Sequence, residues 1–388
     1  MSKFSDRSKW LEERRNAGLY RQRRIVNSAQ SREMFIDGHK LLNFCSNDYL
    51  GLANDKRVIK AFQQAAEIWG VGSGASHLVS GHTKAHEELE EALAEFTGRP
   101  RCLLFSSGYA ANMGAIQGLL SSADHIFEDR LNHASLLDGG RISRARLKRY
   151  MHRDAHDLDN KLSKVSDSKA RKLVVTDGTF SMDGTVCDVD AIAEITHKHN
   201  AWMMLDEAHS LGVIGKQGCG LADPDNYSVN DVQILIGTLG KALGTQGGFV
   251  TGSEELIETL IQQARTYIYS TAIPSAIAVA TLTSLQIARE EEWRRERLRE
   301  LVQKFRIGAT QLGLKLLDSK APIQPIILGD AHTAVKLSNA LEDLGILITA
   351  IRPPTVPANT SRLRITFTAE HTDDDLKQLL SALEQTAA

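Results

Sequence analysis

The feature that most constrains this chain is a pattern that recurs between about residues 100 and 255. Short aliphatic stretches each end in a cluster of small and polar residues, and most lead into a helical stretch. The stretches are residues 102–105, 126–127, 173–176, 202–205 and 234–236. Apolar strands that alternate with helices form parallel sheets covered by helices on both faces. The pattern therefore predicts an α/β fold with a mainly parallel sheet and a site at the carboxyl ends of its strands.

The last of these strands leads into a glycine-flanked lysine. Gly237, Thr238, Gly240 and Lys241 follow the apolar residues, and Gly244 comes three residues later. A lysine amine forms Schiff bases with carbonyl groups, and burial lowers its pKa toward useful values. The alternative is a turn between strand and helix with a solvated lysine. A phosphate-binding P-loop is excluded because the glycine spacing differs and alanine follows the lysine.

Other predicted strand ends carry groups that complement this lysine. Asp206 and His209 follow one strand, and His133 follows another. Each has a structural alternative, namely a helix N-cap for the aspartate and a hydrogen-bonded core imidazole for each histidine. Together with a Ser/Gly turn at 106–108, which offers amides to a phosphate at a helix N-terminus, they fit one ligand. That ligand is pyridoxal 5'-phosphate, whose aldehyde would bind Lys241 and whose ring nitrogen would face Asp206.

The whole chain is predicted to form three segments: 1–45 as an N-terminal helix and connector, 46–285 as a large domain, and 286–388 as a small α/β domain. Asp37 and Gly38 predict a hairpin turn. Residues 280–311 are highly charged and predict a linker helix, and residues 346–350 predict one strand. A basic run from Arg14 to Arg24 is typical of an amphipathic helix with Trp10 turned inward.

Two histidine pairs have the spacing of metal ligands on one helical face. They are His82 with His86 and His152 with His156. A metal site needs further ligands at a recognisable spacing, which neither pair has. We therefore predict ordinary surface histidines and no metal.

Composition narrows the classes of partner. The net charge of -2 favours no polyanion, so nucleic acid is not expected. No apolar run approaches the roughly 20 residues of a membrane span, so no membrane is expected. Four scattered cysteines fit a reducing compartment, and a cytoplasmic location is the expectation.

Six segments together resemble the α-oxoamine synthases, a branch of the fold-type I enzymes that use pyridoxal phosphate. They are residues 43–52, 72–81, 107–109, 180–184, 206–210 and 237–242, in the order of that family. The resemblance implies an acyltransferase with a large domain around a seven-stranded type of sheet, a smaller C-terminal domain, and a homodimer. One departure is Asp177, where the family usually has glutamate; it keeps the charge with a shorter reach.

Within the family, residues 350–357 and Arg21 resemble the branch that serves biotin synthesis. That branch condenses L-alanine with a pimeloyl thioester on acyl carrier protein or coenzyme A, and releases CO2. One alternative is a member that uses glycine and a short acyl-coenzyme A. A second is a pseudoenzyme or binding module on the same fold, which the intact lysine, aspartate and histidines disfavour. A nucleotide-binding P-loop protein is the weakest alternative.

The resemblance also implies roles for individual residues. Lys241 would carry the cofactor and then act as base, with His133, Asp206 and His209 beside it. The cofactor-binding set is Ser107, Gly108, Tyr109, His133, Ser181, Asp206, His209, Thr238 and Lys241, with Ser270 and Thr271 from a second subunit. The substrate-binding set is Arg21, Asn47, His133, Thr355 and Arg364, of which Arg364 would hold the carboxylate of the amino acid.

Overall fold

The computed structural model describes residues 4–387. Within them the chain divides into two compact units, which we describe separately. The larger unit contains residues 50–181 and 186–295, and the smaller contains residues 4–49, 182–185 and 296–387. These limits differ from the three predicted segments, because the N-terminal segment belongs to the same unit as the C-terminal one.

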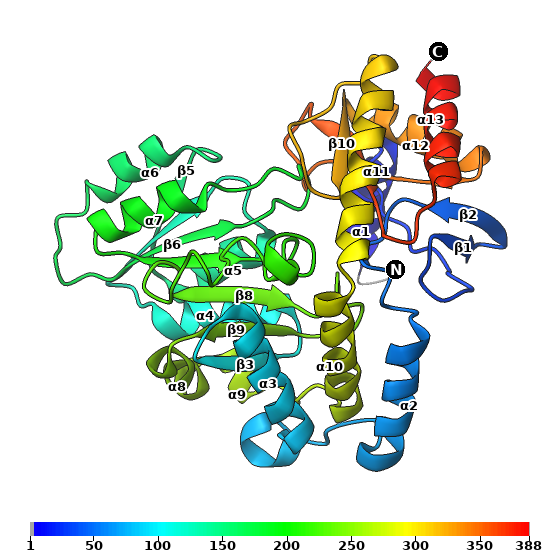
Figure 1. The fold of residues 1–388 in the computed structure, drawn as a ribbon. Coiled ribbons are helices and arrows are strands. Elements are labelled where there is room, and N and C mark those ends of the chain that lie inside the picture. The colour runs from blue at the N-terminus through cyan, green and yellow to red at the C-terminus, as the bar shows by residue number, and fades with distance from the viewer. Residues whose placement is uncertain (1–3, 388) are drawn as a thin grey trace. The chain divides into compact units, whose positions relative to one another are not determined.

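A seven-stranded sheet forms the centre of the larger unit, in the order β3-β9-β8-β7-β6-β4-β5 (Figure 1). The strands are β3 (Arg101–Phe105), β4 (His125–Asp129), β5 (Arg146–Tyr150), β6 (Lys172–Asp177), β7 (Trp202–Asp206), β8 (Ile234–Thr238) and β9 (Gly248–Gly252). Strands β5, β4, β6, β7 and β8 run parallel, and β9 is antiparallel to both of its neighbours. The predicted α/β fold with a mainly parallel sheet is confirmed.

Helices cover both faces of this sheet, which explains why its central strands are largely apolar. Leu103, Val175, Met204 and Ile236 are each at most 2% exposed. The covering helices are α4 (Gly108–Leu119), α5 (Ala134–Ser143), α6 (Ala155–Leu162), α7 (Val189–Lys198), α8 (Glu254–Gln263) and α9 (Arg265–Ile268). Helices α4, α5 and α6 closely follow β3, β4 and β5, so their N-termini lie at the edge where these strands end.

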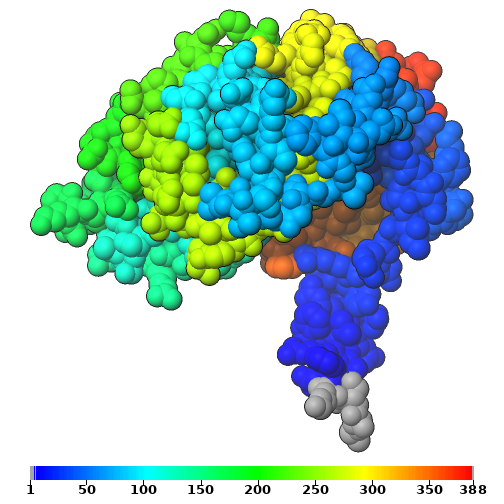
Figure 2. Space-filling view, turned by 90° about the horizontal axis from the view of Figure 1, so that it is seen from below, coloured from blue at the N-terminus to red at the C-terminus, as the bar shows by residue number. Residues whose placement is uncertain are grey.

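Three further helices of the larger unit pack together: α2 (Lys56–Trp69), α3 (Lys84–Thr97) and α10 (Ser275–Glu290). A π-helical turn, η1 (His77–Gly81), connects α2 with α3. Large apolar side chains in this part of the chain are exposed. Ile68 is 74%, Val71 is 86% and Val79 is 79% exposed, and Figure 2 looks onto the face where these blue segments lie.

The smaller unit contains two three-stranded sheets, ordered β1-β2-β11 and β10-β13-β12. Their strands are β1 (Glu33–Ile36), β2 (His39–Asn43), β10 (Ile323–Gly329), β11 (Ile346–Leu347), β12 (Thr349–Ile351) and β13 (Ser361–Thr366). The predicted hairpin is confirmed, because β1 and β2 pair antiparallel across Asp37 and Gly38, which both have positive φ. The helices of this unit are α1 (Ser5–Asn16), α12 (Ala331–Asp343) and α13 (Asp373–Ala387), and α11 (Glu292–Gln311) runs from residue 296 onward within it.

Three local predictions are wrong, and one strand was not predicted. That strand is β5, which begins at Arg146, shortly after α5 ends at Ser143. Residues 346–350 form two short strands that belong to different sheets. The predicted linker helix is two helices, α10 and α11, with a break at Glu291. Trp10 is 47% exposed on α1, which Figure 2 shows in dark blue, so no amphipathic face is buried there.

The histidine pairs also differ from the prediction. His86 is 0% exposed, and its ring forms a capping box with Thr83 at the start of α3 and contacts the Ile273 carbonyl oxygen at 2.7 Å. His82 and His152 both lie before the helices that contain their partners. In each pair, one histidine therefore precedes the helix and the other lies in its first turns, so the two do not share one helical face. None of the described helices is long and apolar enough to cross a membrane.

Candidate active site

Lys241 lies in the turn that joins β8 to β9 at the carboxyl end of β8. Strand β8 ends at Thr238, and the lysine is half-buried three residues later. No helix follows, because β9 returns antiparallel from Gly248. The turn needs a left-handed residue at Gly244, where a Cβ would lie 2.3 Å from the Ala53 amide nitrogen. The glycines around the lysine thus allow the chain to reverse direction.

Asp206 lies at the carboxyl end of β7, the strand next to β8. Its side chain is 4% exposed. Asn112 Nδ2, from α4, donates to Asp206 Oδ2 at 2.7 Å, and the Ala208 amide donates to Asp206 Oδ1 at 2.9 Å. Hydrogen bonds to both oxygens fix the direction of the carboxylate. The structure therefore supports a fixed carboxylate rather than a simple helix N-cap.

The N-terminus of α4 lies at the carboxyl end of β3. Ser107 is the N-cap of α4, and its hydroxyl accepts from the Ala110 amide at 3.1 Å. The amides of Gly108 and Tyr109 are the first two of the helix and have no acceptor within it. A Cβ on Gly108 would lie 3.5 Å from Thr238 Cβ, so the Thr238 hydroxyl stands beside these amides. Amides, hydroxyls and the helix dipole together fit a phosphate group.

Gly248 allows β9 to approach this N-terminus closely. A Cβ at this position would lie 2.4 Å from the Gly108 amide nitrogen. The Gly248→Ala variant is expected to lower the free energy of unfolding by about 1–3 kcal/mol, because backbone must move to admit the methyl group. Urea unfolding would measure the change. The matched control is Gly72→Ala, where nothing lies within 4 Å of the added Cβ, and equal stability of both variants would contradict the prediction.

His133 is the N-cap of α5, directly after the loop from β4. Its Nδ1 accepts from the Ser135 amide at 3.3 Å and lies 2.7 Å from Ser135 Oγ. The residue is exposed as a whole, but desolvation of its ring lowers the pKa of His133; the charge of Asp206 raises this pKa and that of Lys241 lowers it further. The imidazole therefore lies within electrostatic reach of both predicted catalytic groups. The Tyr109 ring meets it edge-on at 6.4 Å between centroids, and the Tyr109 hydroxyl donates to Asp138.

The smaller unit holds a buried arginine on β13. Arg364 is 7% exposed, and its Nη2 donates to Asn47 Oδ1 at 3.1 Å. The Tyr49 hydroxyl donates to the same oxygen at 3.4 Å. Arg21 and Thr355, far apart in sequence, also meet, with 3.3 Å between Arg21 Nη2 and Thr355 Oγ1. The predicted substrate residues of this unit thus form two pairs, Arg364 with Asn47 and Arg21 with Thr355.

For four predicted cofactor residues, the structure gives the position in the chain and the burial. His209 is buried in the turn after β7, and Ser181 is half-buried in the loop after β6. Ser270 and Thr271 follow α9, and Thr271 forms an isolated β-bridge with Ser76. This bridge puts Thr271 beside the exposed apolar segment around Val79. The roles of these four residues stay predictions.

Three residues around the site carry contacts that the sequence did not indicate. Asn112 holds Asp206, Ser135 holds the His133 ring, and Asn132 ties the loop before His133 to β6. Asn112 follows Gly108 by four residues, which places it one turn into α4 and toward the sheet. Asn112 is a polar residue in a helix made mostly of small residues, and this could have indicated its contact with the sheet. Asn132 had none, because its partner Val175 lies on another strand.

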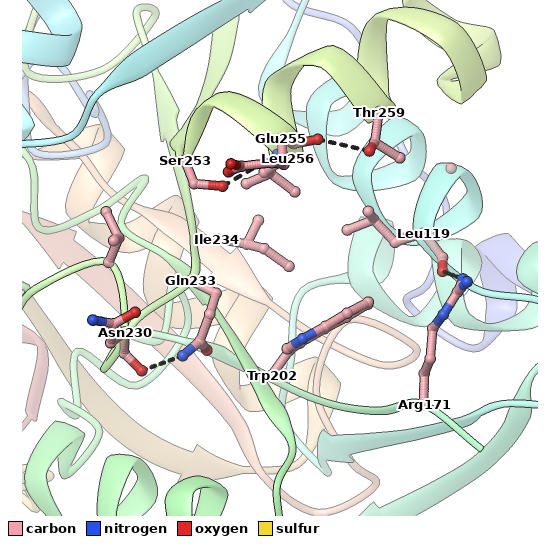
Figure 3. Close-up of a pocket in the computed structure, with 12 residues that line it drawn as sticks. Leu119, Arg171, Trp202, Asn230, Gln233, Ile234, Ser253, Glu255, Leu256 and Thr259 are labelled. Carbon is pink, nitrogen blue, oxygen red and sulfur yellow. Dashed lines mark hydrogen bonds between the residues drawn. The ribbon is translucent and has the colours of Figure 1, made fainter. Parts of the chain in front are cut away.

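A cavity of about 500 Å³ lies at the opposite edge of the sheet (Figure 3). Its lining includes Trp202 and Ile234, the first residues of β7 and β8, and Arg171 from the loop before β6. The predicted chemistry lies at the carboxyl ends of the same strands. This cavity is therefore separate from the candidate active site.

Comparison with known proteins places the chain in a family. Residues 39–383 match the model of aminotransferase class I and II. An 8-amino-7-oxononanoate synthase of Pseudomonas syringae pv. tomato is 57% identical over 97% of this chain and 94% of its own. One from Hahella chejuensis is 57% identical over 99% and 97%. The chain belongs to the 8-amino-7-oxononanoate synthase family of the class I and II aminotransferases. The predicted family is thereby confirmed, and the chain is a pyridoxal-phosphate-dependent acyltransferase.

Solved structures of this wider family have the same fold. A serine palmitoyltransferase of Sphingomonas wittichii superposes with a TM-score of 0.94 at 30% identity, covering 100% of this chain and 98% of its own. An 8-amino-7-oxononanoate synthase of Francisella tularensis gives a TM-score of 0.78 at 32% identity, over 89% and 98%. The fold-type I prediction is confirmed.

The donor set of this chain fits pyridoxal phosphate. It offers a lysine amine for the aldehyde, a buried carboxylate for the ring nitrogen, and a helix N-terminus with two hydroxyls for the phosphate. Each comes from a different strand end of one sheet, on β8, β7 and β3. Asn112 Oδ1 is buried and lacks a hydrogen-bond partner within the described residues, which leaves an acceptor beside Asp206 for a ligand or water.

Proposed function

We propose that this chain condenses L-alanine with the pimeloyl group of a thioester, releasing CO2 and the free carrier and giving 8-amino-7-oxononanoate for biotin synthesis. The observation that carries the proposal is the 57% identity to relatives of that name over 97–99% of the chain. Serine palmitoyltransferases match the fold with a higher TM-score at 28–30% identity. We give the identity more weight, because one fold hosts several substrates.

The residues of the larger unit divide the work of the reaction. Bound pyridoxal phosphate supplies an aldehyde for the substrate amine and a ring that withdraws electrons from its Cα. The α4 N-terminus, Ser107 and Thr238 would hold the phosphate. Asp206 would keep the proton on the ring nitrogen, and Asn112 holds Asp206 in place. The Lys241 amine removes the Cα proton of alanine as general base.

The histidines and Tyr109 support this chemistry by contact and hydrogen bonding. His133 would lie against the ring face and donate to an oxygen of the acyl substrate. His209 would donate to the phenolic oxygen of the cofactor, Tyr109 would flank the ring, and Ser181 would add a polar contact. These roles follow from the family resemblance, and the burial of His209 supports its role.

Substrate groups fall to the residues of the smaller unit. Arg364 binds the alanine carboxylate with its planar fork, and Asn47 keeps that fork in one orientation. Arg21 and Thr355 contact the acyl substrate. Their hydrogen bond supports a shared role, since it joins the two sequence segments that carry the resemblance to this branch.

We propose that the active enzyme is a homodimer in the cytoplasm. Ser270 and Thr271 of one subunit would approach the cofactor phosphate of the other. The exposed Ile68, Val71 and Val79 support a partner surface, because large exposed apolar groups are typical of interfaces. Thr271 pairs with Ser76 in an isolated β-bridge, so it lies close to these exposed apolar residues. Four free cysteines fit a reducing compartment.

A panel of substrates tests the proposed reaction. The purified enzyme with pyridoxal phosphate is given alanine or glycine, each with pimeloyl, acetyl or succinyl thioesters of coenzyme A and with pimeloyl-acyl carrier protein. Release of CO2 and of free thiol is followed. Turnover is expected with alanine and a pimeloyl carrier, and the two carriers reveal which is used. Preference for glycine with a short acyl group would overturn the proposal.

A further inference from the structure

The Asp177 carboxylate holds the backbone of His133. Asp177 ends β6, and its Oδ2 accepts from the His133 amide at 2.7 Å. Two more hydrogen bonds join the same loop to β6. The Asp177 amide donates to Asn132 Oδ1 at 3.1 Å, and Asn132 Nδ2 donates to the Val175 carbonyl oxygen at 2.8 Å. The loop that carries His133 is therefore fixed to the sheet by three bonds.

The ring of His133 is fixed as well. A backbone amide can only donate, so the Ser135 amide at 3.3 Å requires a lone pair on Nδ1. In the neutral imidazole the single proton then lies on Nε2. Desolvation of the ring lowers the pKa of His133, which favours this neutral form. The ring thus presents an Nε2–H donor whose place depends on the backbone that Asp177 holds.

We propose that Asp177 is a positioning residue, which sets the place of His133 so that Nε2–H can donate to an oxygen of the cofactor or acyl substrate. The inference rests on the proposed function for the identity of that oxygen. Its structural part, the dependence of His133 on Asp177, is independent of the substrate. It also gives a role to the position where the family usually has glutamate, because the aspartate reaches the His133 amide directly.

The surroundings of Asp177 disfavour a negative charge on its side chain. The side chain is 4% exposed, and Asp177 pairs in register with Asp206 on β7. Burial raises the pKa of Asp177 well above its usual value, and the Asp206 charge raises it further. Asparagine would offer the same acceptor without the charge. Asp177→Asn is therefore the matched variant that keeps the bond, and Asp177→Ala removes it.

The test combines these variants with His133→Ala and the double variant Asp177→Ala/His133→Ala. Two quantities are measured: the dissociation constant of pyridoxal phosphate for the apoprotein, by absorbance titration, and kcat/KM with alanine and pimeloyl thioester. Asp177→Ala is expected to worsen both by about 10–100-fold, since displacement of an active-site group by about 1 Å has such effects. Asp177→Asn should stay within about 3-fold of the wild type. In the His133→Ala background the Asp177→Ala change should add no more than about 2-fold.

A spectroscopic readout needs neither substrate nor cofactor. In apoprotein with 15N-labelled histidine, the His133 ring signals are assigned by their loss in His133→Ala. Asp177→Ala should shift them or mix their tautomers, and Asp177→Asn should not. Unchanged His133 signals, or losses that multiply in the double variant, would overturn the inference even if the enzyme makes the proposed product. If Asp177→Ala does not fold, Asn132→Ala tests the same loop and should change the His133 signals in the same way.

Discussion

Replacement of Lys241 by alanine is expected to abolish turnover, with a loss of at least about 10²–10⁴-fold from the missing general base alone. The same variant should lose the visible absorbance that a cofactor has when it is bound to a lysine amine. The physical reason is the position of the amine, at the end of β8 and within electrostatic reach of His133. Steady-state assays and an absorbance spectrum of the purified protein would measure both effects.

Lys216→Ala is the matched control for this variant. Lys216 is exposed, and its Nζ pairs with Asp225 at 2.7 Å on the surface. Such pairs contribute little to stability, so activity and spectrum should stay as in the wild type. If a lysine-dependent visible band persists in Lys241→Ala, Lys241 is not the cofactor lysine. Equal loss in both variants would indicate a general effect of removing a lysine.

The Asp206→Asn variant is expected to lower kcat by about 10²–10³-fold, since a fixed charge next to the reacting system is lost. A neutral amide cannot keep a proton on the ring nitrogen of the cofactor. The variant should also lose about 1–3 kcal/mol of stability. Asn112 and Ala208 each donate to one carboxylate oxygen, and asparagine has a single oxygen to accept from both. Enzyme kinetics and urea unfolding separate the two effects.

Asp188→Asn is the control for the aspartate. Asp188 is exposed and caps α7, where its side chain accepts from the Ala191 amide at 3.1 Å. Asparagine caps helices as well as aspartate does, so neither activity nor stability should change. An Asp206→Asn enzyme with normal kcat would remove Asp206 from the catalytic set. The proposed role of Asn112 would then have no basis either.

The sequence predicted the centre of the fold better than its margins. Strands such as β6 and β8 are apolar on both faces, and this pattern can be recognised without their neighbours. Strand β5 escaped prediction because it is an edge strand with the sequence of residues 146–150, which contains three basic residues. Most side chains of this edge strand are only partly buried, so its sequence has no continuous apolar run. Residues 346–350 were read as one strand, since nothing local shows that β11 and β12 pair in different sheets.

The candidate site divides in the same way. The sequence by itself determined which chemical groups follow which strands: Lys241 after β8, Asp206 at the end of β7, His133 after β4. It did so because a parallel sheet brings the carboxyl ends of its strands to one edge, whatever the details of packing. The family resemblance added roles to residues such as Arg364 and Thr355, which no local pattern marks.

Only the tertiary structure decided how these groups are held. Asn112 reaches Asp206 from a helix 94 residues away in sequence, and Asp177 reaches His133 across 44 residues. Such contacts depend on strand register and on the direction of each side chain, to within an ångström. No sequence spacing encodes them, because the partners are brought together by the strand order of the folded sheet. The sequence thus determined the reacting groups, and the fold decided their orientation and their hydrogen-bond partners.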